Sequence, residues 1–97
     1  MRYEIEFAPQ AAQDYRDLDA HVRGSVRDAI EVHLRHQPAK TGKSRIKRLR
    51  SLSRPQFRLR VGDIRVFYDV TETTVEVLAI VAKSQANERL ERCGEKS

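Results

Sequence analysis

The first half of the chain begins with the hydrophobic period of a strand and continues with the period of helices. In residues 3–7 apolar and polar side chains alternate, which is typical of a half-buried strand. From Pro9 to Leu18 the apolar spacing is that of an amphipathic helix, and a second helix is predicted over 20–35, with Pro38 just past its end. Few residues separate the two helices, so we expect an antiparallel helical hairpin.

The second half of the chain returns to the period of strands. Residues 57–61 and 64–69 each alternate in the manner of a strand. Between them, Gly62 and Asp63 are typical of a two-residue hairpin loop. Residues 75–82 are nearly all apolar, which predicts a strand in the interior of a sheet.

A short helix is predicted to close the fold. Ser84 is expected to cap its N-terminus, the helix carries Ala86 and Leu90, and Gly94 is expected to end it. The order of elements is then β-α-α-β-β-β-α. This is an α+β fold in which a helical hairpin packs on a mostly antiparallel four-stranded sheet. With 97 residues, the chain is expected to form a single domain over 1–97.

Composition excludes several classes of protein. The mean hydropathy is -0.66, no apolar run approaches the length of a membrane span, and the N-terminus lacks the apolar region of a signal peptide. We therefore expect a cytoplasmic protein with no membrane partner. Cys93 has neither a second thiol nor a nearby histidine, and the chain contains no Gly-rich phosphate loop or HExxH motif. These observations predict neither a metal site nor a cofactor.

The net charge of +5 is concentrated in the middle of the chain. Residues 41–70 hold nine basic and two acidic side chains, a balance of +7, whereas the segments on either side each have a balance of -1. Such a block favours a polyanionic partner, most often nucleic acid; the alternative is a solvated loop whose charges only aid solubility. The residues expected to contact phosphates are Lys43, Arg45, Lys47, Arg48, Arg50 and Arg60.

The register of the predicted hairpin places three arginines together. With the loop at 62–63, Arg60 pairs with Arg65, and Arg58 shares their face, while Tyr68 and the apolar residues occupy the opposite face. Like charges directly opposite each other cost stability, so we expect removal of Arg65 to raise it. Clustered guanidinium groups are suited to binding phosphate oxygens and to stabilising charge that develops on phosphorus.

Two interpretations of the arginine face follow. The first is a phosphate-binding or catalytic site, and the second is a solvated outer face neutralised by Asp69 and Glu76. The histidines offer no clear alternative chemistry, because all three fall in the helical region. Among them, His33 lies on the apolar stripe, which favours a packed side chain over a catalytic base.

At this point the chain resembles the RelE/ParE superfamily of bacterial toxins. The resemblance is carried by the order of elements, the stretch Lys47-Arg48-Leu49, the hairpin sequence FRLRVGDIRVFY and the closing strand VLAIVAK, and it covers almost the whole chain. A RelE-like member would be the toxin of a type II toxin-antitoxin system. Such a toxin is a ribosome-dependent, metal-independent mRNA endoribonuclease that inhibits translation. The resemblance implies as partners the ribosome, mRNA and a cognate antitoxin, acidic and partly disordered, in a hetero-oligomeric complex.

The resemblance also implies catalytic residues. Arg58 falls where RelE-type enzymes place a basic residue that acts on the 2′-hydroxyl or the scissile phosphate. Arg65 matches the arginine that stabilises the pentavalent transition state. Lys83 lies next to a position where many members have an arginine or histidine, and it is expected to take over contacts to the leaving group or the phosphate. The basic pair and following tyrosine that are frequent near the C-terminus of the family stand here as Lys83-Ser84 and Leu90.

This departure leaves two other functions open. One is that of the ParE branch, which inhibits DNA gyrase and cleaves no RNA. The other is that of a catalytically inactive member, which acts only with its antitoxin in operator binding and autoregulation.

Overall fold

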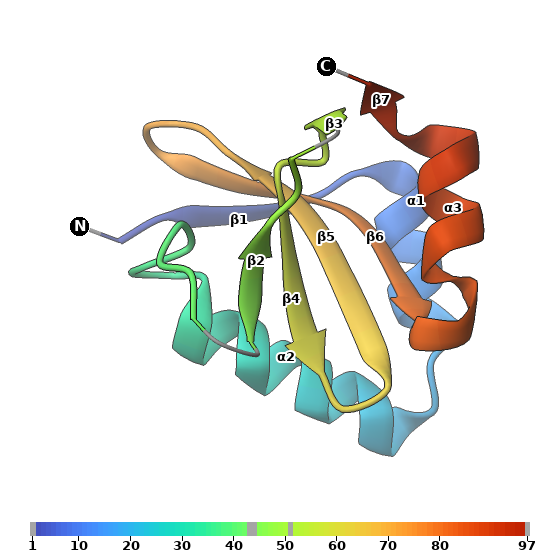
Figure 1. Ribbon diagram of the computed structural model, residues 1–97. Coiled ribbons are helices and arrows are strands. Elements are labelled where there is room, and N and C mark those ends of the chain that lie inside the picture. Colours follow the sequence, from blue (N-terminus) through green and yellow to red (C-terminus); the bar gives the residue numbers. More distant parts are fainter. Residues whose placement is uncertain (1, 43–44, 51, 97) are drawn as a thin grey trace.

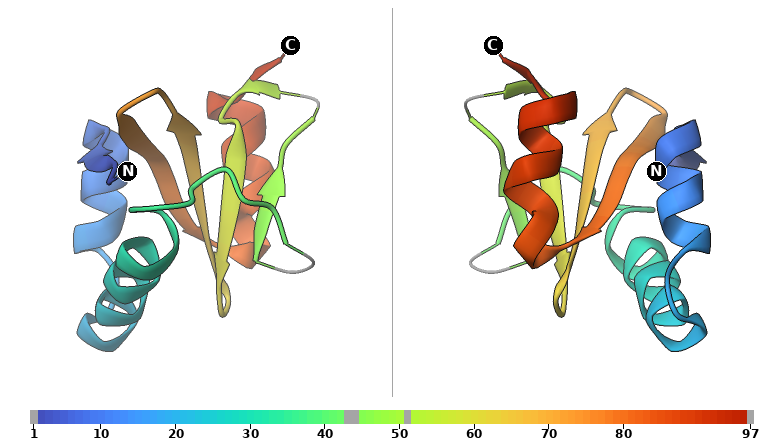
Figure 2. Two further views of the ribbon diagram at one scale, coloured as in Figure 1. Left: turned by 90° about the vertical axis from the view of Figure 1, so that its left-hand side faces the viewer. Right: turned by 90° about the vertical axis from the view of Figure 1, so that its right-hand side faces the viewer.

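The computed structural model describes residues 2–42, 45–50 and 52–96 (Figure 1). Two helices cover one face of a five-stranded sheet and a third helix covers part of the other face, as Figure 2 shows from both sides. The elements are β1 (Glu4–Phe7), α1 (Pro9–Arg16), α2 (Ala20–His33), β2 (Ile46–Arg48), β3 (Leu52–Arg54), β4 (Phe57–Val61), β5 (Ile64–Val70), β6 (Thr74–Ala82), η1 (Lys83–Gln85), α3 (Ala86–Cys93) and β7 (Glu95–Lys96).

The main sheet has the strand order β1-β6-β5-β4-β2. Only the pairing of β1 with β6 is parallel, so the prediction of a mostly antiparallel sheet is confirmed, as is the interior position of β6. The prediction of four strands missed β2, which adds a fifth strand beside β4. Its single apolar residue, Ile46, pairs with Leu59, and the basic residues around Ile46 hide any alternation. A small second sheet joins β3 to β7 near the C-terminus.

The hairpin of β4 and β5 has the predicted register. Val61 pairs with Ile64, Arg60 with Arg65, and Phe57 with Tyr68. At the loop, Gly62 has a φ of 59°, a left-handed conformation that favours glycine. The register is therefore fixed by the loop, and it determines which side chains share each face of the sheet.

The larger core lies between the sheet and the first two helices. Val26, Leu34 and Leu59 are fully buried there, and the hydroxyl of buried Tyr68 donates to the carbonyl of Pro38 at 2.6 Å. α1 and α2 are joined by a short turn at 17–19, but they diverge from it instead of lying side by side as the expected antiparallel pair would (Figures 1 and 2). Each helix thus covers a different part of the sheet.

A smaller core lies under α3 on the opposite face. Phe67, Ala79 and Val81 of the sheet pack there against Ala86 and Leu90. The helix ends at Gly94, as predicted, but the prediction that Ser84 caps its start is wrong. The residues around Ser84 form the short 3-10 turn η1, and α3 begins two residues later without a side-chain cap. Among the described residues, no helix has the length and apolar character needed to cross a membrane.

Candidate functional site

The basic strands lie next to each other at one edge of the main sheet. β2 is the edge strand, and Lys47 is the register partner of Arg58 on β4. Arg58 in turn pairs with Phe67, whose side chain packs under α3. Because cross-strand partners point to the same face, these side chains lie on the face that α3 covers in part. We call the set Lys47, Arg58, Arg60 and Arg65 the arginine face.

The members of the arginine face differ in burial. Lys47 and Arg60 are exposed, and Arg58 is half-buried. Arg65 is only 7% exposed, and its Nη1 donates to the carbonyls of Gly62 at 2.8 Å and Ile64 at 3.1 Å. The Arg65 side chain is therefore folded back onto the hairpin loop that it follows, and the expectation that its removal stabilises the fold no longer holds.

Arg58 has the least favourable surroundings of the three arginines. Burial lowers the pKa of its guanidinium, and the nearby charges of Arg65 and Arg60 lower it further. Its Nε is buried and has no hydrogen-bond partner among the residues that the structure describes. A buried donor without an acceptor costs about 1 to 3 kcal/mol, so folding alone gives no reason for this placement. An anion on the arginine face would offset the excess positive charge.

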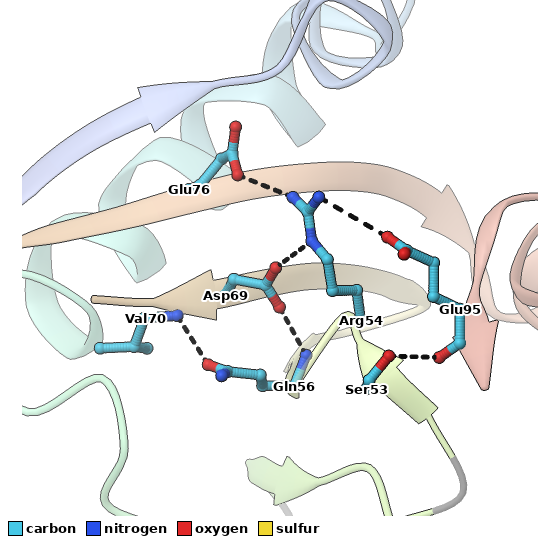
Figure 3. Close-up of polar contacts among 7 residues, drawn as sticks. All are labelled: Ser53, Arg54, Gln56, Asp69, Val70, Glu76 and Glu95. Atoms are coloured by element: carbon cyan, nitrogen blue, oxygen red, sulfur yellow. Dashed lines mark hydrogen bonds and ion pairs between the residues drawn. The ribbon is translucent and has the colours of Figure 1, made fainter. Parts of the chain in front are cut away.

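The two acids expected to neutralise the arginine face bind another arginine instead. Arg54 donates from Nε to Asp69 at 2.6 Å and from Nη2 to Glu76 at 2.9 Å, and its Nη1 lies 3.6 Å from Glu95 (Figure 3). Asp69 also accepts from the backbone N–H of Gln56 at 2.8 Å. In the described part of the chain, no ion pair joins the arginine face to an acid. The interpretation as a neutralised outer face is therefore wrong.

The remaining predicted phosphate contacts do not all gather on the arginine face. Arg45 is exposed, and its guanidinium contacts the ring of His33 on α2. Arg48 is the register partner of Phe57 and lies over its ring, 5.1 Å from the centroid, on the side of the larger core. Arg50 is exposed in the turn after β2, and Lys43 lies outside the described residues.

Lys83 lies at the loop end of the hairpin. Its backbone N–H donates to the carbonyl of Asp63 at 2.6 Å, and its side chain is exposed. An open depression of about 590 Å³ is lined by Asp63, Ala82, Lys83, Ser84 and Asn87. Sequence reasoning missed Asn87, although its spacing of four from Lys83 could have indicated a shared helical face. Lys83 therefore borders the end of the arginine face where Arg65 sits, since Arg65 pairs with Val81 two residues before it.

Leu90 occupies the position that the resemblance assigns to a tyrosine. It packs against the smaller core under α3. A leucine supplies neither a ring on which a base can stack nor a proton donor. The candidate site therefore consists of cations and backbone polar groups, with the polar depression at one end.

A buried ion pair that sequence reasoning also missed holds α3 in place. Arg89 donates from Nη1 and Nη2 to the two carboxylate oxygens of Asp14 on α1, at 2.8 and 2.9 Å. The backbone N–H of Ile80 also donates to Asp14, at 3.0 Å. Burial alone would raise the pKa of Asp14, but the hydrogen bonds from Arg89 and Ile80 outweigh it and hold the pKa below its usual value. This ion pair links α3, which carries Asn87 of the depression, to α1 on the other side of the sheet.

The sequence matches a toxin family, and the fold is shared with chains of known toxin-antitoxin complexes. A family model described as the ParE toxin of type II toxin-antitoxin systems, parDE, matches residues 5–87. A chain of the RelBE2 toxin-antitoxin complex from Mycobacterium tuberculosis is 24% identical, with 84% of this chain and 99% of that chain covered and a TM-score of 0.70.

More distant structures share the fold. A chain of the YoeB dimer from Staphylococcus aureus is 20% identical, with coverages of 81% and 94% and a TM-score of 0.58. A chain of the DinJ-YafQ complex from E. coli is 13% identical, with coverages of 87% and 96% and a TM-score of 0.58. No curated protein matches the chain significantly.

Proposed function

The chain belongs to the ParE toxin family of type II toxin-antitoxin systems, and we propose that it is a ribosome-dependent mRNA endoribonuclease that inhibits translation. The observation that carries the proposal is the unneutralised arginine face, with the half-buried Arg58 at its centre. One guanidinium group can bind two phosphate oxygens at once, and it stays protonated. Holding these cations together lowers the stability of the fold. An RNA phosphate is the partner that best explains why they are nevertheless placed together.

The reaction that fits these residues is attack by a ribose 2′-oxygen on the adjacent phosphorus. The new O2′–P bond forms as the P–O5′ bond breaks, the 2′-hydroxyl loses its proton to solvent and the departing 5′-oxygen gains one from solvent, which leaves a 2′,3′-cyclic phosphate and a 5′-hydroxyl. Arg58 and Arg60 would bind the non-bridging oxygens and stabilise the charge of the pentavalent transition state; such a donor typically contributes about 10² to 10³ in rate. Arg65 would hold the loop and add positive charge, and Lys83 would contact the leaving group.

The residues named above supply positive charge but offer no clear general base or general acid for proton transfer. An arginine is protonated at any physiological pH, so Arg58 does not serve as the base. The position of the family's tyrosine holds Leu90. We therefore expect a slow enzyme whose acceleration comes mainly from orientation and charge stabilisation, without a metal.

The proposed partners follow from the same features. Neighbours of similar fold form toxin-antitoxin complexes, and we propose that a cognate antitoxin, acidic and partly disordered, binds this chain in a hetero-oligomeric complex. Its acidic residues would cover the arginine face when the toxin is inhibited. The ribosome and mRNA would be the targets of the free toxin in the cytoplasm.

Cleavage of a reporter mRNA in a translating extract tests the proposal. The unmodified protein should produce cuts with 5′-hydroxyl ends, and Arg58→Ala should abolish them. Arg16→Ala removes an exposed arginine from the end of α1 and is the matched control, which should cleave normally. Intact mRNA at concentrations of protein that stop growth would overturn the proposal.

Inhibition of DNA gyrase is the second candidate function. It is favoured by the family match, which is to the ParE model, and by Leu90 at the position of the tyrosine. A supercoiling assay run with the same protein separates the two, because a gyrase inhibitor blocks supercoiling and leaves mRNA whole. If neither activity is found, the third possibility is an inactive member that acts with its antitoxin at the operator.

A further inference from the structure

A second basic site lies away from the arginine face, at the end of α2. A pocket of about 190 Å³ opens between the C-terminal end of this helix and the segment that leads into β2. We call it the α2-end pocket. It is lined by Val32, His33, His36, Gln37, Lys40, Thr41, Gly42, Arg45 and Ile46. Four of these residues carry or can gain a positive charge, and none is acidic.

The contact between His33 and Arg45 fixes the protonation of the imidazole. A guanidinium has only donors, so the Nε2 of His33 must accept from the Nη1 of Arg45. The ring is therefore neutral in this arrangement. Burial lowers the pKa of His33, and the charge of Arg45 lowers it further. The other titratable groups that line the pocket are His36 and Lys40, and none of the described lining residues is acidic.

The pocket's cationic side chains contribute little to the core. His36, Lys40 and Arg45 are exposed, and no acidic partner binds them in the described part of the chain. Gln37 and Thr41 add neutral hydrogen-bond donors to the same wall. An anion with several oxygens would satisfy this arrangement of donors better than water does.

The pocket and the arginine face meet at the edge of the sheet. The carbonyl of Arg45 accepts from the backbone N–H of Arg60 at 2.8 Å, so the two backbones are adjacent. The side chain of Arg45 turns to α2, whereas Arg60 points to the arginine face. An extended polyanion that crosses the β2 edge would therefore contact both.

We propose that the α2-end pocket binds a phosphodiester of the RNA strand whose neighbouring phosphates lie on the arginine face. The identity of the polyanion rests on the proposed function, whereas the binding of phosphate by His33, Lys40 and Arg45 rests on the pocket itself. Binding should strengthen as the pH falls. Protonation turns both ring nitrogens of His33 into donors, breaks its contact with Arg45 and frees that guanidinium for the phosphate. The C-terminal end of α2 also favours the imidazolium.

Binding of a short RNA with 2′-O-methyl groups throughout tests this proposal, because such RNA cannot be cleaved through its 2′-oxygens. Lys40→Ala should weaken binding about three- to tenfold and lower the slope of log affinity against log salt by about 0.7. Arg16→Ala, which removes an exposed charge from α1, should change neither. The affinity of the unmodified protein should rise from pH 7.5 to 5.5. His33→Gln should remove part of this rise, and the double variant His33→Gln, His36→Gln should remove most of it, because His36 lines the same pocket.

NMR of the histidine rings shows whether the pocket itself is occupied. RNA should raise the pKa of His33 in the unmodified protein, and inorganic phosphate alone should do so only weakly. Equal responses to both, with no displacement of phosphate by RNA, would overturn the assignment to RNA. An unchanged salt slope in Lys40→Ala would overturn the pocket as a phosphate site. If these binding results hold while mRNA stays uncut in extracts, the endoribonuclease proposal fails and the pocket stands.

Discussion

Arg58 and Arg65 lie on the same face of one hairpin but make different contributions to the fold. Arg65 is buried and donates to two carbonyls of its own loop. Arg58 is half-buried and lies among like charges, and its buried Nε has no partner in the described parts of the chain. The first arginine therefore supports the loop, and the second is held in an unfavourable place. Single substitutions should separate these roles.

Arg58→Ala should abolish growth arrest while leaving stability unchanged or higher by up to about 1 kcal/mol. Removal of the side chain relieves the unsatisfied donor and the repulsion from Arg60 and Arg65. Urea unfolding of the purified variant, set beside toxicity at matched expression, measures both effects. Marked destabilisation would show that Arg58 is a structural residue.

Arg65→Ala should lower the free energy of unfolding by about 1 to 2 kcal/mol, because two carbonyl contacts and a buried aliphatic stem are lost. This is the opposite of what strand pairing alone predicts. Arg60→Ala is the matched control, since it relieves the same Arg60–Arg65 opposition from the exposed side and should cost almost nothing. Equal unfolding midpoints for the two variants would contradict the role given to Arg65.

The sequence predicted which face of the sheet each hairpin side chain occupies, but it did not predict the ion-pair partners of those side chains. The glycine of the hairpin loop and the period of two were enough to place Arg58, Arg60 and Arg65 together. They could not show that Asp69 and Glu76 bind Arg54, because that contact depends on how β3 folds over the sheet (Figure 3). The pairing of Asp14 with Arg89 joins residues 75 positions apart, and no local pattern indicates it.

At the scale of whole elements, the segments with a clear hydrophobic pattern were predictable and the segments without one were not. β1, α1, α2, β4 and β5 each have a clear period, β6 is a nearly continuous apolar run, and each forms near its expected place. β2 has three residues, and within 2–42, 45–50 and 52–96 its only strand partner in the main sheet is β4. The pairing with β4 therefore determines the strand conformation of β2, because the composition of β2 alone is typical of a basic loop.

The attachment of α3 to the rest of the fold should depend on the charge of Asp14. The folded-state pKa of Asp14 is lowered, so its stabilising effect is present above the unfolded pKa and is lost as the pH falls through the lower, folded value. We expect the amides of α3 to exchange faster as the pH drops below about 4, after correction for the intrinsic rate.

Asp14→Asn should loosen α3 at neutral pH and make its exchange much less sensitive to acid, at a cost of up to about 3 kcal/mol. Hydrogen exchange followed by mass spectrometry measures this directly, and Asp17→Asn is the matched control because Asp17 is exposed on the same part of the chain. If α3 exchanges alike in both variants, the ion pair does not anchor it.

At the scale of the molecule, strand order separates the charges. β1, with exposed Glu4 and Glu6, forms one edge of the sheet, and basic β2 forms the other. The basic side chains of β2 and β4 are therefore gathered toward one edge of the sheet, opposite the acidic side chains of β1. Such a polarity orients an approaching polyanion and speeds its encounter more than it strengthens the final complex.

The same polarity leads to a prediction for the complex with an antitoxin. An acidic antitoxin should associate more slowly as salt rises, while apolar contacts keep the complex together at high ionic strength. To test this, the toxin is purified with the product of the short open reading frame beside its gene, and hydrogen exchange is measured free and bound. Protection should appear over the β4–β5 hairpin, over α3, or over both. Tight binding that protects neither segment would show that inhibition does not work by covering the arginine face or displacing α3.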